Sequence, residues 1–89
     1  MHPTREAAQA IRDGAIDASA ALDAALTNAL EHLPTADHAP LKRAVGQVMG
    51  AIVLDLLNPP IAAHPDLEVN DAEWGEIARS RAAARAVRR

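Results

Sequence analysis

The chain has 89 residues, a formal net charge of −3, one aromatic residue (Trp74) and no cysteine. This length predicts a single domain over residues 1–89, built around one small core. The lack of cysteine excludes a disulfide framework, a thiolate zinc site and a cysteine nucleophile. Without Phe or Tyr, the core has to be built from Leu, Ile, Val and Ala, which favours closely packed helices. The first residues lead into no apolar signal segment, so we expect a cytoplasmic protein.

The first predicted element is a helix over about residues 4–32. Thr4 can act as its N-cap, and Pro34 marks its end. Between Ile11 and Leu33 the apolar residues recur at steps of three and four, which is the spacing of one helical face.

The second predicted helix, over about residues 36–57, is the most informative part of the chain. Twelve of the fourteen residues from 44 to 57 have no polar side chain. A helix that is apolar on every side is typical of a buried position. The run is shorter than the roughly 20 residues that a membrane span needs, so we expect no membrane association. Asn58, Pro59 and Pro60 predict the end of this helix, followed by a short helical turn at about residues 60–64.

The third predicted helix covers about residues 71–87. Asn70 and Glu73 have the spacing of a capping box, and arginines gather at the other end. The sequence therefore predicts an all-α fold, a three-helix bundle-like protomer with a short helical turn between the second and third helices.

A chain this short has too little material to surround the second helix. We therefore expect a homodimer, or a higher symmetric oligomer, whose shared core fully buries that helix. The predicted interface residues are the large apolar side chains of the run: Val45, Val48, Met49, Ile52, Val53 and Leu56.

Gly46 and Gly50 form a small-xxx-small pair within the same helix. Such a pair lets two helix backbones approach closely. Two interpretations are open: a close crossing against the first helix of the same chain, which is favoured, or a face for self-association.

Asp55 is the one charge deep in the apolar run. A buried acid can mark a functional site, but a structural role is favoured here. We expect it to pair with an arginine or to accept hydrogen bonds from backbone N–H groups after Pro60.

Charge is unevenly distributed along the chain. Residues 13–40 contain five acids and no Lys or Arg, whereas residues 79–89 contain five arginines and no acid. We predict that the last helix lies along the first, with Arg81 and Arg85 close to Asp13 and Asp17. The alternative is that the arginine-rich helix binds nucleic acid, a less favoured partner because the chain as a whole is acidic.

Catalytic and metal-binding patterns are missing from the sequence. Four scattered histidines show no metal-ligand spacing, and no nucleophile motif or phosphate loop is present. We expect no enzyme activity, no cofactor and no metal. The sequence favours a non-catalytic interaction or adaptor protein that self-associates through its central helix, with a nucleic-acid-associated regulator as the alternative.

Overall fold

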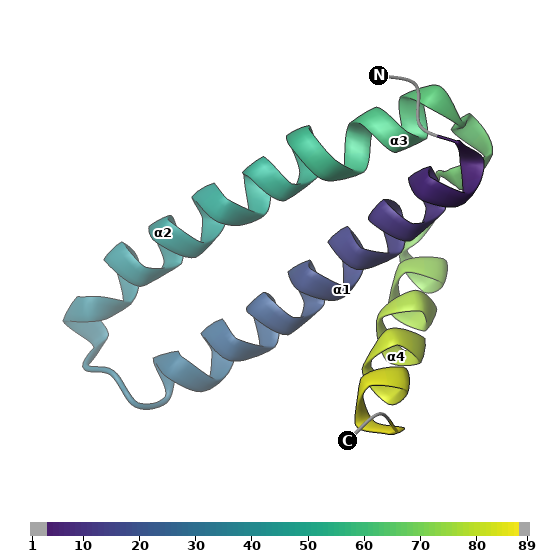
Figure 1. The fold of residues 1–89 in the computed structure, drawn as a ribbon. Helices are drawn as coiled ribbons and strands as arrows, with labels where there is room; N and C mark the ends of the chain where they lie inside the picture. The colour runs from purple at the N-terminus through teal and green to yellow at the C-terminus, as the bar shows by residue number, and fades with distance from the viewer. Residues whose placement is uncertain (1–3, 88–89) are drawn as a thin grey trace.

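A computed structural model describes residues 4–87, and this part of the chain is all-α with no strand, as predicted. The helices form rods joined by short connectors (Figure 1). The first rod is α1 (Arg5–Leu30), the second contains α2 (His38–Ala51), η2 (Ile52–Leu57) and α3 (Asn58–Ala63), and the third is α4 (Asp71–Val87). Two short 3₁₀ turns, η1 (Thr35–Asp37) and η3 (Pro65–Leu67), lie in the connectors.

The N-cap of α1 is the predicted one. Thr4 accepts a hydrogen bond from the backbone N–H of Ala7 through Oγ1 at 3.1 Å. The α-helix ends at Leu30, slightly before the predicted boundary. His38 then closes the connector by donating from Nε2 to the carbonyl oxygen of Leu33 at 3.0 Å.

The second rod does not end at Leu57, so that predicted boundary is wrong. The chain passes through a π-helix, η2, in which the N–H of Asn58 bonds to the carbonyl of Val53, five residues back. Pro59 and Pro60 then lie in the first turn of α3, where a missing N–H leaves no bond broken. The predicted turn at residues 60–64 is therefore mostly the end of this rod, and η3 follows it.

The start of α4 has the predicted capping box. The N–H of Glu73 donates to Oδ1 of Asn70 at 2.8 Å, and the N–H of Asn70 donates to Oε1 of Glu73 at 3.3 Å. Two orphan N–H groups are satisfied reciprocally, which fixes where the helix begins.

The core lies at one end of the molecule, where all three rods meet. Ala15 and Ile16 of α1 pack with Leu57 of η2, and Trp74 and Ile77 of α4 pack against this cluster. Away from the core, α1 and the α2 rod continue as a two-helix hairpin, with α4 beside only part of α1 (Figure 1). The chain therefore covers one side of the α2 rod and leaves the other side open.

Candidate interaction surface

The most distinctive surface of this molecule is the uncovered side of α2 and η2. Four large apolar side chains of this rod are exposed: Val48 at 52%, Val53 at 37%, Leu54 at 67% and Leu56 at 47%. Scattered exposed apolar residues are normal, but four on one rod of a small protein concentrate exposed apolar area on that rod.

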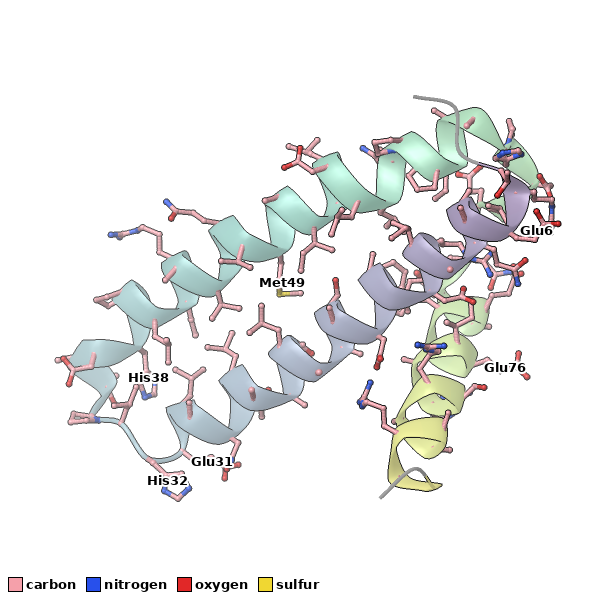
Figure 2. All side chains as sticks on the ribbon, in the orientation of Figure 1. Glu6, Glu31, His32, His38, Met49 and Glu76 are labelled. Atoms are coloured by element: carbon pink, nitrogen blue, oxygen red, sulfur yellow. The ribbon has the colours of Figure 1, made fainter. Side chains whose placement is uncertain are left out.

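The structure divides the six predicted interface residues into two groups of three. Val45, Met49 and Ile52 are half-buried, and Figure 2 shows Met49 directed toward α1. Val48, Val53 and Leu56 are exposed. Within a single chain the second helix is far from fully buried, since Leu57 is the one buried residue of the run 44–57.

Leu54 was missed as an interface residue, although it is the most exposed large apolar side chain of the described chain. It lies inside the apolar run, but an all-round apolar pattern does not indicate which side of a helix is covered.

Gly46 and Gly50 make no close crossing with α1, so the favoured interpretation of this pair is wrong. A Cβ atom built on either glycine would meet nothing within 4 Å. Both residues are exposed. Because the first helix does not use the space above these glycines, a self-association face is the interpretation that stays open.

The molecule exposes more surface than a folded monomer of its size. Its accessible area is 6274 Å² at a mass of 9.4 kDa, whereas about 5,000 Å² is typical of a monomer of that mass. Its radius of gyration is 14.8 Å, against about 12 Å for a compact chain of this length. The excess area exceeds the roughly 800 Å² per partner that a standard interface buries.

By length and composition alone, the helical stretch Thr35–Ala63 is apolar enough to cross a membrane. Its most apolar window is 17% buried. The core helix of a water-soluble protein can pass the same test. Length and composition therefore do not decide whether lipid or protein covers this stretch.

Asp55 is exposed, so the expected buried position is wrong. No ion pair joins Asp55 to any residue within 4–87. It follows Leu54 in the sequence and points about a quarter turn away from it round the rod. Arg43, one of two bases in α2, is exposed as well and has no ion pair in the described part of the chain.

The predicted charge pairing between α4 and α1 is present for one arginine. Arg85 donates to the carboxylate of Asp17 and forms an ion pair with it. Asp13 pairs instead with its neighbour Arg12, at 2.8 Å. Arg81 lies in a shallow groove that Asp13 also lines. Arg88 and Arg89 lie outside the described residues.

Arg12 is a structural residue that the sequence interpretation missed. Its guanidinium also donates to the carbonyl oxygen of Leu67 at 3.0 Å, so it joins α1 to η3. The sequence position of Arg12 next to Asp13 could have indicated their ion pair. The contact with Leu67 could not be predicted in this way, because it depends on the path of the chain after Pro65.

A second shallow groove, of about 330 Å³, lies where α1, α2 and α4 meet. Ser19 lines it, and its Oγ is buried with no hydrogen-bond partner among the described residues. The other lining residues are mostly small or apolar: Ala20, Asp23, Ala24, Met49, Trp74, Gly75 and Ala78.

Residues 4–87 contain no group of side chains that could bind a metal ion. No three His, Cys, Asp or Glu side chains of that range gather in a way that could hold an ion. His32 and His38 lie at the connector between α1 and α2 (Figure 2).

Comparison with protein-family models, with curated proteins and with solved structures finds no match for this chain.

Proposed function

We propose that this protein is a non-catalytic interaction protein that self-associates as a homodimer through the exposed face of α2 and η2. The observation that carries this proposal is the exposure of four large apolar side chains on the one rod formed by α2 and η2: Val48, Val53, Leu54 and Leu56. Burying such surface against a second copy is favourable by about 25 cal/mol for each Å² of apolar area.

The excess surface supports this proposal quantitatively. A second copy that covered the open side of the rod would bring the exposed area per chain toward the value typical of compact proteins. Homodimers commonly bury the most apolar part of their surface, and here that part is α2 and η2.

The test is the oligomeric state of the wild-type chain and of two matched variants. Leu54→Glu places a charge in the proposed interface, whereas Ile11→Glu makes the same change at an apolar residue of α1 that is 48% exposed. We expect the wild type and Ile11→Glu to sediment as dimers, and Leu54→Glu to sediment as a folded monomer.

A wild-type chain that stays monomeric at several hundred micromolar would overturn the proposal. If that monomer bound to phosphatidylcholine vesicles, the apolar rod would be a membrane surface. Circular dichroism of each variant separates loss of association from loss of folding.

A nucleic-acid role has less support. Arg85 forms an ion pair with Asp17 of the same chain, so part of the positive charge of the C-terminal helix is already neutralised. Binding of a labelled duplex at physiological salt, with a log–log salt slope near −3 to −4 that is lost in Arg81→Ala/Arg85→Ala, would favour it instead.

A further inference from the structure

We propose that the two copies of the dimer pair antiparallel along α2 and η2, with the two-fold axis beside Gly50, so that Arg43 of each copy meets the partner's Asp55. This inference rests on the proposed function, and it adds the face, the direction and the register of the contact.

The face is defined by Leu54 and the two residues that precede it at helical spacing. Gly46, Gly50 and Leu54 follow one another at steps of four, so they form one line along the rod. Leu54 projects, with 67% of its surface exposed. The glycines leave open space, since no atom lies within 4 Å of a Cβ built on them.

In an antiparallel pair, the projecting Leu54 side chain of one copy fits the open space at a glycine of the other. In a two-fold symmetric interface, a residue before the axis faces the residue equally far after it. Gly46 and Leu54 are each four residues from Gly50. The projecting Leu54 of one copy therefore lies over the space at the partner's Gly46, and the absence of a side chain at Gly50 lets the backbones approach at the axis.

Charge favours the same direction. Between residues 38 and 63 the rod has one acid, Asp55, and two bases, Lys42 and Arg43. Arg43 and Asp55 are twelve residues apart, about 18 Å along a helix, so they cannot pair within one rod. A parallel dimer would place Arg43 against the partner's Arg43, and Asp55 against the partner's Asp55, which is repulsive.

The antiparallel register brings opposite charges together instead. Arg43 lies seven residues before Gly50 and Asp55 lies five after it. The difference of two residues is about 3 Å along the helix. Asp55 follows Leu54 and lies about a quarter turn round the rod from it, so the long Arg43 side chain meets Asp55 at the edge of the contact. Symmetry then produces two such ion pairs, one on each side of the axis.

The test is a charge exchange measured by sedimentation equilibrium. Arg43→Glu and Asp55→Arg each place like charges opposite one another, and each should raise the dimer dissociation constant by roughly tenfold at low salt, because two pairs are lost together. The double variant Arg43→Glu/Asp55→Arg restores both pairs with reversed sign, and its dissociation constant should return to within about threefold of wild type. Both substitutions are at exposed positions, so circular dichroism should show an unchanged fold in all three variants.

A crosslink provides a second readout of the register. Since the chain has no cysteine, Gly50→Cys introduces a single thiol. A disulfide requires Cα atoms within about 7 Å of each other, a distance that this register gives only near the axis. Gly50→Cys should form a covalent dimer on mild oxidation, and Ala83→Cys, at an exposed position of α4, should not.

The outcomes separate the two proposals. A monomeric wild type contradicts the homodimer itself. A dimeric wild type whose charge-reversed single variants are not rescued by the double variant contradicts the antiparallel register and leaves the homodimer standing. Rescue together with a Gly50→Cys crosslink supports both.

Discussion

Arg12 donates a hydrogen bond from Nη1 to the backbone carbonyl oxygen of Leu67, at 3.0 Å, across fifty-five residues of sequence. The Arg12 side chain is 11% exposed and also holds Asp13. Leu67 itself is almost completely buried, at 1% exposure. This one guanidinium therefore fixes the position from which the chain turns into α4.

The first prediction follows from this contact. Arg12→Ala should lower the free energy of unfolding by about 2 kcal/mol, since a charged hydrogen bond is lost and Asp13 stays partly buried without its cation. Arg79→Ala, at an exposed position of α4, should change it by less than about 0.5 kcal/mol. Urea denaturation at one fixed protein concentration measures both. Equal effects of the two substitutions would contradict the structural role of Arg12.

A second prediction concerns pH. Arg5 donates to Asp66 from Nε at 2.8 Å, and this hydrogen bond holds the pKa of the Asp66 carboxyl below its usual value of 3.8. Because the pKa is lower in the folded state, the stabilisation is fully present above pH 3.8 and is lost as the pH falls through the folded-state value. Asp66→Asn should therefore reduce the fall in melting temperature between pH 5 and pH 2. If the melting temperature of Asp66→Asn falls as much between pH 5 and pH 2 as that of the wild type, the Arg5–Asp66 pair does not contribute to the pH dependence of stability.

Ser19 gives a third prediction. Its buried Oγ has no hydrogen-bond partner in the described part of the chain, so its desolvation is not compensated there. Ser19→Ala should leave the free energy of unfolding unchanged or raise it by up to about 1 kcal/mol. Thermal unfolding followed by Trp74 fluorescence reports on the same groove. A loss of more than 1 kcal/mol would mean that the hydroxyl is satisfied in the folded protein.

The helix boundaries were largely predictable, because they depend on local chemistry. Thr4, Asn70 and Glu73 form the caps that their residue types and spacing indicate. The end of the second rod was not predictable from the same rules. Two successive prolines are usually read as a helix stop, yet the π-helical turn before them lets a new helix begin with both prolines in its first turn.

The surface was less predictable than the helices. A run that is apolar on every side of a helix does not indicate which side is covered. Met49 on the covered side and Leu54 on the open side therefore look equivalent in the sequence. Gly46 and Gly50 likewise indicate a close contact without indicating the partner. Long-range charge pairing was predictable only in outline: Arg85 reaches Asp17, whereas Asp13 is held by its neighbour Arg12.

A fourth prediction links stability to association. If folding and dimerisation are coupled, the melting temperature of the wild type should rise with protein concentration, because mass action favours the bound state. Leu54→Glu should melt at the same temperature at all concentrations. Differential scanning calorimetry across a hundredfold concentration range measures this. A wild-type melting temperature independent of concentration would contradict the coupling.

The most direct measurement is sedimentation equilibrium of the wild-type chain between about 1 and 300 μM. Self-association through α2 and η2 predicts a mass that approaches twice 9.4 kDa as the concentration rises. A mass that stays at 9.4 kDa over the whole range would contradict it.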